Sequence, residues 1–184
     1  MIFILLPAYN EEKSFPPLME KLKHVLEQIG KDFKILVCND GSTDRTSEML
    51  KEYSIKLPIE VIEHSINRGL GESSRDLFER VVEIGKEGDV IIRMDCDDTH
   101  EPKYIPDILA KLEKGYDVVV ASRFKKGGGQ MGVYGYRALI SRAANLFMKL
   151  FFPIQGLREY SCGYRGYQFT KLKEAIDLFG NNFI

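Results

Sequence analysis

Three aspartates lie within four residues in the stretch RMDCDDTH, residues 93–100, which directly follows the apolar run Val90–Ile92. Carboxylates this close raise one another's pKa unless a cation lies between them. Hard divalent cations such as Mg²⁺ or Mn²⁺ take oxygen ligands of this kind, usually together with the phosphates of a substrate. Side chains alternate along an extended segment, so Asp95 and Asp97 should share one side and Cys96 should face the other. The pattern therefore predicts a metal site at Asp95 and Asp97.

The same stretch has two other interpretations. Asp97, Asp98 and Thr99 could cap the helix expected to follow, and for Asp98 capping is at least as good an interpretation as metal ligation. The letters DCDDT also fit the DxDxT pattern of phosphatases with an aspartyl nucleophile, in which Asp95 would be phosphorylated and Asp97 would serve as acid and base. Such phosphatases carry the pattern after their first strand, whereas here it follows the fourth expected strand. Its position therefore disfavours the phosphatase.

Short apolar runs alternate with amphipathic stretches along the chain and predict the elements that position these residues. Strands are expected at Ile2–Leu6, Phe33–Cys38, Ile59–His64, Val90–Met94 and Val118–Ser122, and helices at Phe15–Ile29, Arg45–Tyr53, Leu70–Gly85 and Tyr104–Lys114. A long helix from about Tyr136 to Phe152, a strand near Tyr164–Phe169 and a last helix from Lys171 follow. This alternation predicts an α/β domain with a mostly parallel central sheet flanked by helices.

Polar residues follow each of the first five expected strands. They form the stretches PAYNE (7–11), NDGSTD (39–44) and SINRG (65–69), then the acidic stretch, and finally Arg123. Ligands of open α/β sheets bind at the carboxyl ends of the strands, where such loops converge. One edge of the sheet is therefore expected to hold the functional site.

Length, charge and cysteine content exclude several classes of protein. With 184 residues, 44% of them hydrophobic, the chain can bury one substantial core, which predicts a single domain. A net charge of −1 gives no bulk attraction to nucleic acid, so none is expected as a partner. Three widely spaced cysteines disfavour a secreted disulfide framework and favour a reducing compartment, so a cytoplasmic location is expected.

The two ends of the chain carry further expectations. The apolar start MIFILLP lacks the basic region and the length of a signal peptide and is expected to be the first strand. No stretch approaches the roughly 20 apolar residues of a transmembrane helix. The chain ends at NNFI soon after a helical segment, so a fragment of a longer protein is expected.

Six motifs in order give the sequence a family resemblance. LLPAYNEE, CNDGSTDRT, NRGLG, MDCDD, ASRF and SCGYR resemble the signatures of the family 2 glycosyltransferases of the GT-A fold, and in particular the branch of the dolichol-phosphate mannose synthases and polyprenyl-phosphate glycosyltransferases. The resemblance runs from Ile2 to about Phe169. It implies a single GT-A domain over 1–184, with a nucleotide-sugar-binding half at about 1–123 and an acceptor-side half at about 124–184.

The resemblance implies roles for residues around the nucleotide. Pro7, Tyr9 and Glu11 would line its pocket, where the Tyr9 ring offers a face for stacking. Asp40 would accept a hydrogen bond from the base, and the segment Asn67–Gly69 would let the backbone approach the base, since glycine permits such closeness.

The resemblance also implies roles around the diphosphate. Asp95 would reach the ribose, and Asp97 would hold the Mg²⁺ or Mn²⁺ that neutralises the leaving nucleoside diphosphate. Arg123 and Arg137 would clamp phosphate oxygens with their planar guanidinium groups. The alternative for both arginines is a solvated surface side chain, and this alternative fits Arg137 better than Arg123.

The implied reaction is inverting transfer of a hexose from a UDP- or GDP-sugar to an acceptor, expected to be a polyprenyl or dolichyl phosphate. A hydroxyl acceptor would need a base, for which Glu159 is the candidate, whereas a lipid phosphate is already ionised. The long helix has an apolar face made up of Leu139, Ile140, Ala143, Leu146, Phe147, Leu150 and Phe151. This face could lie at the cytoplasmic face of a membrane, or the helix could be core or pack on missing C-terminal residues. The aspartyl phosphatase and a non-catalytic nucleotide-sugar-binding domain remain the alternative functions.

Several residues depart from the family pattern or lack a motif. Asn39 and Glu159 stand where relatives often carry aspartate, and Thr99 stands where the synthase branch carries glutamine. Without a CxxC pair, the cysteines at the strand ends are expected to be buried apolar residues rather than zinc ligands. His100 is expected to bond the backbone rather than a metal, and His64 carries no partner pattern.

Overall fold

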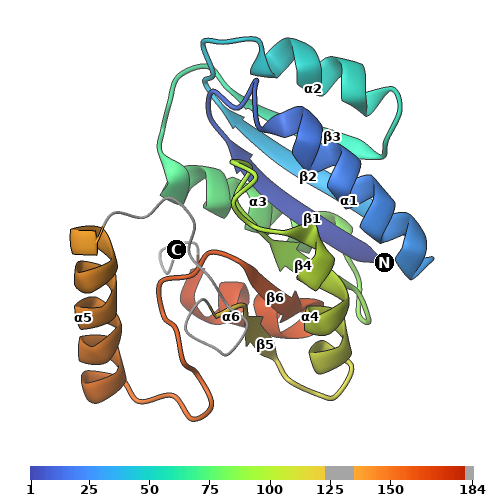
Figure 1. Ribbon diagram of the computed structural model, residues 1–184. Coiled ribbons are helices and arrows are strands. Elements are labelled where there is room, and N and C mark those ends of the chain that lie inside the picture. Colours follow the sequence, from blue (N-terminus) through green and yellow to red (C-terminus); the bar gives the residue numbers. More distant parts are fainter. Residues whose placement is uncertain (123–134, 181–184) are drawn as a thin grey trace.

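Six strands form one sheet in the order β3-β2-β1-β4-β6-β5 (Figure 1). The computed structural model describes residues 1–122 and 135–180, with only the backbone described at 135–138 and 142. The strands are β1 (Ile2–Ala8), β2 (Phe33–Asp40), β3 (Ile59–His64), β4 (Val90–Arg93), β5 (Val118–Val120) and β6 (Arg165–Gln168). The first four are parallel, and β6 runs antiparallel to its neighbours β4 and β5. The predicted mostly parallel sheet is confirmed.

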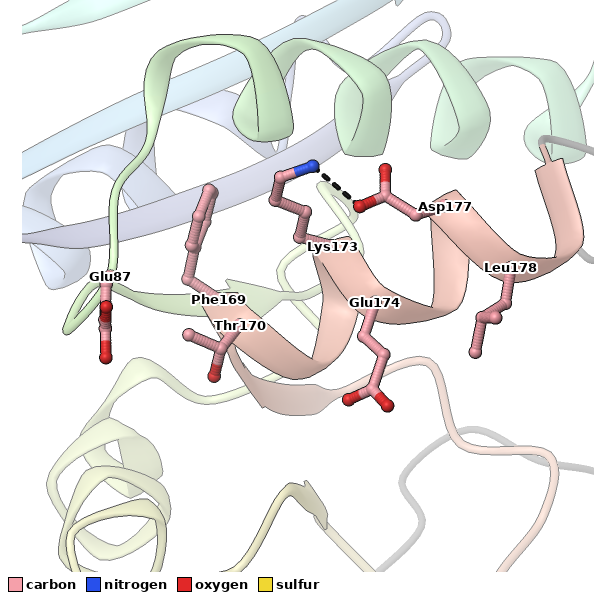
Figure 2. A pocket seen from close by; sticks show the side chains of 7 residues that line it. All are labelled: Glu87, Phe169, Thr170, Lys173, Glu174, Asp177 and Leu178. Atoms are coloured by element: carbon pink, nitrogen blue, oxygen red, sulfur yellow. Dashed lines mark hydrogen bonds and ion pairs between the residues drawn. The ribbon is translucent and has the colours of Figure 1, made fainter.

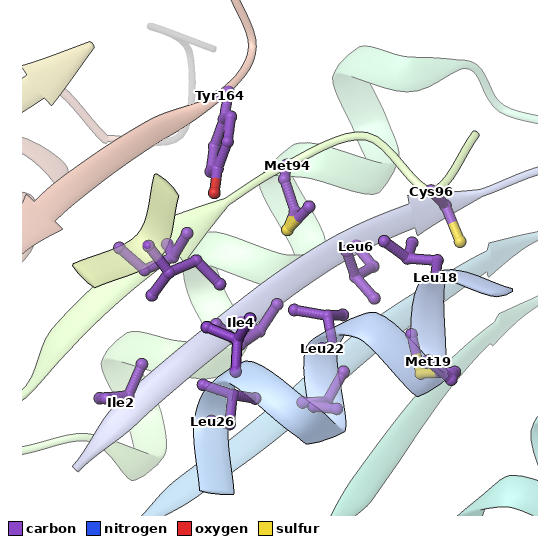
Figure 3. Packing of buried hydrophobic residues seen from close by; sticks show 14 of the residues in the cluster. Ile2, Ile4, Leu6, Leu18, Met19, Leu22, Leu26, Met94, Cys96 and Tyr164 are labelled. Atoms are coloured by element: carbon purple, nitrogen blue, oxygen red, sulfur yellow. The ribbon is translucent and has the colours of Figure 1, made fainter. Parts of the chain in front are cut away.

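Helices cover both faces of this sheet. The helices of the described chain are α1 (Phe15–Ile29), α2 (Thr46–Ser54), α3 (Leu70–Ile84), α4 (Ile105–Leu112), α5 (Gly135–Phe151) and α6 (Phe169–Phe179), with a 3₁₀ turn at Pro102–Tyr104. Buried side chains of α1, α2 and α4 pack on one face of the sheet, which Figure 3 shows from close by. Those of α3 and α6 pack on the other face. The core therefore consists of two apolar layers with the sheet between them.

Strand β1 lies at the centre of this arrangement because it pairs with β2 on one side and with β4 on the other. All seven of its residues are buried. Ile4 and Leu6 face the layer of α1, and Phe3 and Leu5 face the layer of α3, as the two-residue period of a strand requires. The run is apolar throughout because neither face of the strand meets water.

Helix α1 has the bounds that its periodicity predicts. Its buried residues recur three and four positions apart: Phe15, Leu18, Met19, Leu22, Val25 and Leu26. Proline occupies its first turn, where a missing N–H costs nothing. Gly30 follows in the left-handed conformation, and its N–H donates to the Leu26 carbonyl, which ends the helix.

Other element boundaries differ from the prediction by a few residues. The predicted helix at 104–114 is a 3₁₀ turn followed by the shorter α4. The predicted strand at 118–122 ends at Val120, although the Ala121 N–H still donates to the Tyr164 carbonyl. The last helix begins at Phe169 rather than Lys171, and the Phe169 N–H donates to the Asp89 carbonyl just before β4.

Helix α5 stands apart from the sheet (Figure 1). The apolar side chains predicted for its face are exposed, between 55% and 70% for Leu139, Ile140, Leu146, Phe147, Leu150 and Phe151. Within the described part of the chain, this face of α5 is therefore not part of the core. The Asn145 side chain ties α5 to the following loop by donating to the Arg158 carbonyl and accepting from the Tyr160 N–H. Among the described residues, no helix has both the length and the apolar character needed to cross a bilayer.

Candidate functional site

The loops after β1 and β2 lie together at the carboxyl edge of the parallel strands, because these strands pair in register up to Ala8 and Asn39. The Asn10 N–H donates to Ser42 Oγ (3.0 Å), and Asn10 Oδ1 accepts from the Thr43 N–H (2.8 Å). The Glu11 N–H donates to Thr46 Oγ1 (2.8 Å). The predicted convergence of these two loops is confirmed.

Pro7 and Tyr9 flank the end of β1. Pro7 is buried and pairs with Cys38 of β2, whereas the Tyr9 side chain is 45% exposed. An exposed aromatic ring at this edge offers an apolar face to a planar ligand. The roles of both residues as nucleotide contacts stay predictions.

Glu11 connects the β1 loop electrostatically to the acidic stretch. Burial raises the pKa of Glu11; a hydrogen bond from Ser14 Oγ acts against this shift, and the negative charges of Asp97, Asp44 and Asp95 add to it. Carboxylates from two separate loops thus repel one another at the sheet edge. A bound divalent cation would relieve that repulsion, so the residues present fit the predicted metal.

Asp95 is oriented by a buried arginine. Arg93 Nη1 lies 2.8 Å from Asp95 Oδ1, and Arg93 itself is buried. A Cβ on Gly163 would lie 1.8 Å from that Nη1, so Gly163 leaves the space that the guanidinium occupies. The Asp95 N–H donates to His100 Nδ1 (2.9 Å), and the His100 ring stacks on Tyr164 with centroids 5.2 Å apart. The predicted backbone bond of His100 is confirmed.

Asp97 and Asp98 have different environments. Asp97 is exposed, and its Oδ1 accepts from the N–H and Oγ1 of Thr99 (3.1 and 2.6 Å), which fixes the orientation of the carboxylate. Asp98 instead forms an ion pair with Lys21 Nζ (2.9 Å). Neither aspartate caps the helical turn at 102–104, which has no side-chain cap, so the capping interpretation is wrong. Asp97 remains the acidic side chain of this stretch that is turned to solvent.

Asp40 organises the loop after β3. Its carboxylate is buried and accepts hydrogen bonds from the Arg68 N–H (2.9 Å), the Gly69 N–H (2.8 Å) and His64 Nδ1 (2.6 Å). Burial acts to raise the pKa of Asp40, but these three donors outweigh it and lower the pKa. A direct contact between Asp40 and a base stays a prediction.

His64 is a residue of this site that reasoning from the sequence missed. It lies opposite Asp40 in the register of β2 and β3. The sequence offered one indication that the two side chains meet, since Asp40 and His64 each stand at the end of a strand, next to a turn signal. Their pairing depends on the register, which the sequence of one strand alone does not fix.

The loop after β3 contains a backbone conformation that requires glycine, and its approach to a base stays a prediction. Asn67 is exposed, and Gly69 has φ 93° and ψ 162°, a conformation essentially restricted to glycine. Asn39, where relatives often carry aspartate, is buried and donates to Glu63 Oε2 (2.7 Å). Asn39 therefore forms a hydrogen bond with Glu63, whereas an aspartate at this position would repel the Glu63 carboxylate.

The remaining predicted site residues are Glu159 on the acceptor side and the two arginines expected to contact phosphate, Arg123 and Arg137. Glu159 is fully buried in the loop before β6. Arg137 lies in α5, of which only the backbone is described at this position, and Arg123 lies outside the described residues. Their proposed contacts with phosphate stay predictions.

The cysteines match their prediction as buried apolar residues. Cys38 and Cys96 are buried, as predicted, and Cys162 is buried as well. Cys96 points into the core beside α1 (Figure 3), which leaves Asp95 and Asp97 on the outer side of the same segment.

A shallow hollow beside α6 lies away from this edge (Figure 2). Its lining includes Glu87 and Phe169, which lie near the start of β4, at the amino ends of the parallel strands. Lys173 and Asp177 of the hollow form an ion pair with each other (2.7 Å). The hollow therefore does not belong to the candidate site.

Solved structures show the fold. Glucosyl-3-phosphoglycerate synthase from Mycobacterium tuberculosis, in a complex with Mn²⁺, UDP-glucose and phosphoglyceric acid, superposes with a TM-score of 0.66 at 17% identity, over 99% of this chain and 67% of that one. S. aureus TarS (residues 1–349) superposes with a TM-score of 0.61 at 21% identity, over 94% of this chain and 48% of that one. The predicted GT-A fold is confirmed.

Sequence comparison shows the family. Dolichol-phosphate mannosyltransferase of Pyrococcus furiosus is 30% identical over 96% of this chain and 47% of its own length. Undecaprenyl-phosphate 4-deoxy-4-formamido-L-arabinose transferase of Pectobacterium carotovorum is 31% identical over 91% of this chain and 48% of its own length. The chain thus spans about half the length of the curated relatives it matches. Residues 3–176 match the sequence model described as Glycosyl transferase family 2, and the chain belongs to this family.

Proposed function

We propose that this chain transfers a hexose from a UDP- or GDP-sugar to a polyprenyl or dolichyl phosphate, with inversion at the anomeric carbon and with Mg²⁺ or Mn²⁺ bound. The observation that carries the proposal is the gathering of Glu11, Asp95 and Asp97 at the carboxyl edge of the sheet, where the Glu11 pKa is raised by burial and by neighbouring carboxylates. Oxygen ligands of this charge suit a hard divalent cation. The same edge is where α/β sheets bind nucleotides.

The names of similar proteins support the proposed donor and acceptor. The two relatives described above are named for dolichol phosphate and undecaprenyl phosphate. One structural neighbour was crystallised with Mn²⁺ and UDP-glucose, and another, S. aureus TarS, with UDP-GlcNAc. In our proposal this chain shares a sugar-nucleotide donor with the two structural neighbours and a lipid-phosphate acceptor with the two relatives.

Asp95 and Asp97 would hold the metal, and neighbouring residues keep them in place. Arg93 orients Asp95 through the 2.8 Å ion pair, and Thr99 orients Asp97 through its two hydrogen bonds. When bound, the ion supplies Lewis-acid neutralisation of the diphosphate leaving group. In the same proposal Arg123 and Arg137 contact the phosphates.

On the nucleotide side, the exposed ring of Tyr9 would stack on the base or ribose. The backbone of 67–69, shaped by its bonds to Asp40, would face the base. Pro7 and Glu11 would complete the pocket wall between these two parts.

The proposed reaction requires little proton transfer by the protein. An oxygen of the acceptor phosphate forms the new bond to the anomeric carbon, while the bond from that carbon to the diphosphate oxygen breaks and its electron pair leaves with the diphosphate. A lipid phosphate is ionised at neutral pH, so no side chain has to act as a base. The buried Glu159 is then a structural residue; a hydroxyl acceptor would instead require it as the base.

The exposed apolar side chains of α5 suit a peripheral contact with the membrane that holds such an acceptor. Phe147 and Phe151, whose ring centroids are 4.4 Å apart, are more than half exposed. Burying aromatic and aliphatic surface of this kind at the headgroup boundary binds a helix to a bilayer surface. We place this contact at the cytoplasmic face of the membrane.

Thermal unfolding with nucleotides and a divalent ion tests the proposal. UDP or GDP is expected to raise the melting temperature with Mn²⁺ present and not with EDTA, and the matching sugar nucleotide with polyprenyl phosphate is expected to give a glycosylated lipid. Absence of any metal-dependent shift would refute the site. Binding without product under all donors would identify a non-catalytic nucleotide-sugar-binding domain.

Two matched aspartate variants locate the metal. Asp97→Asn is expected to weaken metal-dependent nucleotide binding by about ten- to hundredfold, the effect of losing one bond to a charged group. Asp98→Asn is the control, because Asp98 is engaged by Lys21 and asparagine tolerates its positive φ of 57°. Isothermal titration calorimetry of both variants decides, and equal affinities would remove Asp97 from the metal site.

A further inference from the structure

The His64 ring bridges two carboxylates. Nδ1 lies 2.6 Å from Asp40 Oδ1, and Nε2 lies 2.6 Å from Asp76 Oδ2, which belongs to α3. The His64 side chain is only 4% exposed, so water does not compete for these bonds. The His64 imidazole thus links the end of β2 to α3, the helix that follows the loop after β3.

This geometry fixes the protonation of the ring. An ionised carboxylate only accepts hydrogen bonds, so both ring nitrogens must donate, and a histidine with two donors is an imidazolium. The other groups around the ring agree with a positive charge. Burial raises the pKa of the Cys38 thiol to about 11, so this neighbour is neutral, and the Arg68 guanidinium lies on the outer side, 3.4 Å from Asp76. Among the described residues, Asp40 and Asp76 therefore lie near two cations, the buried His64 imidazolium and the exposed Arg68 guanidinium.

The bridge extends to the loop after β3 through Asp40. The two oxygens of Asp40 accept from the backbone N–H groups of Arg68 and Gly69. The same loop touches the loop after β2 so closely that a Cβ on Gly41 would lie 2.4 Å from the Ile66 carbonyl carbon. The position of the Asp40 carboxylate therefore sets the backbone at 66–69, and His64 sets the position of Asp40.

We propose that His64 is a positioning residue whose doubly hydrogen-bonded imidazolium holds Asp40, and through it the backbone of residues 66–69, in the shape that receives the nucleotide. This inference rests on the proposed function, because it takes that backbone to face the base.

The charge on His64 makes this positioning sensitive to pH. Burial acts to lower the pKa of His64, but the hydrogen bonds to Asp40 and Asp76 outweigh it, and the pKa is raised above the ordinary value of about 6.5. The contribution to loop order is therefore complete below that ordinary value and is lost as the pH rises through the raised pKa. Neutral imidazole donates from one nitrogen only, so one of the two bonds must break.

A zinc ion is the competing occupant of this cluster. Cys38 Sγ, His64 Nε2 and an Asp76 carboxylate oxygen lie within 4.8 Å of one another, and these types of side chain bind zinc. The Nε2–H group already donates to Asp76, so a zinc ion would have to displace this proton. The two states exclude each other and can be told apart.

Nuclear magnetic resonance of the whole chain with ¹⁵N-labelled histidine reads the charge directly. We expect His64 to titrate with a midpoint above its ordinary value of about 6.5, with both ring nitrogens protonated below that midpoint, and we expect the amide signals of Arg68 and Gly69 to shift with the same midpoint. A midpoint at or below the ordinary value, or amide signals indifferent to the titration of His64, would overturn the inference. This measurement needs no variant and no nucleotide.

Two isosteric variants then link the charge to binding. Asn at position 64 can reproduce the donor to Asp40 and Gln the donor to Asp76, so His64→Asn and His64→Gln each keep one neutral bond. The affinity of the wild type for UDP or GDP with Mn²⁺ is expected to fall by about tenfold as the pH rises from 6 through the midpoint measured for His64, whereas both variants should bind weakly at pH 6 and lose this part of the pH dependence. His24→Gln is the control, because His24 is exposed on α1 and bonds Gln28.

Each remaining outcome has one meaning. Variants with the affinity and pH profile of the wild type would overturn the inference, and so would an increase in melting temperature of EDTA-treated wild type, but not of His64→Asn, on adding equimolar Zn²⁺. If the wild type binds no nucleotide at any pH, the proposed function fails. The amide signals of Arg68 and Gly69 then still decide whether His64 orders the loop.

Discussion

Replacing Gly163 by alanine tests whether Arg93 positions Asp95. A Cβ at this position would lie 1.8 Å from Arg93 Nη1 and 3.3 Å from Asp95 Oδ1, whereas real Cβ atoms essentially never approach within 3.0 Å. The guanidinium must therefore move by about 1.2 Å, the difference between 3.0 and 1.8 Å. Such a shift directed away from Asp95 lengthens the 2.8 Å contact beyond hydrogen-bonding distance.

The cost follows from the environment of the two partners. A hydrogen bond between charged groups contributes about 1.5–3 kcal/mol, and because Asp95 is 34% exposed, water screens part of this interaction. We expect Gly163→Ala to lower the free energy of unfolding by about 1–2 kcal/mol. We also expect metal-dependent nucleotide affinity to fall by about tenfold, because Asp95 is no longer held.

Urea unfolding and calorimetric titration with Mn²⁺ and nucleotide measure the two effects separately. Gly166→Ala is the matched control: its Cβ would lie 2.3 Å from Ile108 Cγ2 in the core, so it should cost about 1–3 kcal/mol of stability without changing affinity in the folded protein. If Gly163→Ala loses stability but binds nucleotide and metal as the wild type does, Arg93 is a structural residue only and does not position Asp95 for binding.

Two further predictions concern the core and α5. Leu22 is fully buried, so Leu22→Ala should lower the free energy of unfolding by about 2–5 kcal/mol in urea, and a change below 1 kcal/mol would mean that α1 is not packed as described. The double variant Phe147→Ser with Phe151→Ser should reduce sedimentation with vesicles of anionic phospholipid severalfold while leaving the melting temperature within a few degrees, because both rings are exposed. Unchanged sedimentation would show that α5 does not contact the bilayer.

The sequence predicted the helices and strands whose burial follows one regular pattern along their whole length. β1 is buried on both faces and α1 is buried along one stripe, so a continuous apolar run and a three-to-four spacing identify them. The convergence of polar loops was also predicted, because parallel strands bring their carboxyl ends to one edge.

The sequence alone did not predict relations between segments that depend on tertiary structure. His64 meets Asp40 through the register of β2 and β3, and it meets Asp76 through the way α3 packs on the sheet. Asp98 binds Lys21, which lies 77 positions away in the sequence. None of these three relations leaves a local pattern, because each joins segments that only the tertiary structure brings together.

The placement of β6 between β4 and β5 has a consequence for the order of assembly. β4 is complete at Arg93, yet one of its two hydrogen-bonding sides stays open until Arg165–Gln168 arrives. Closing such a distant pair is slow because a long loop must first lose its freedom. A nascent or proteolysed chain that stops before residue 165 therefore presents the apolar edge of β4 to any other strand, and its aggregation should be suppressed by supplying residues 165–168 in trans.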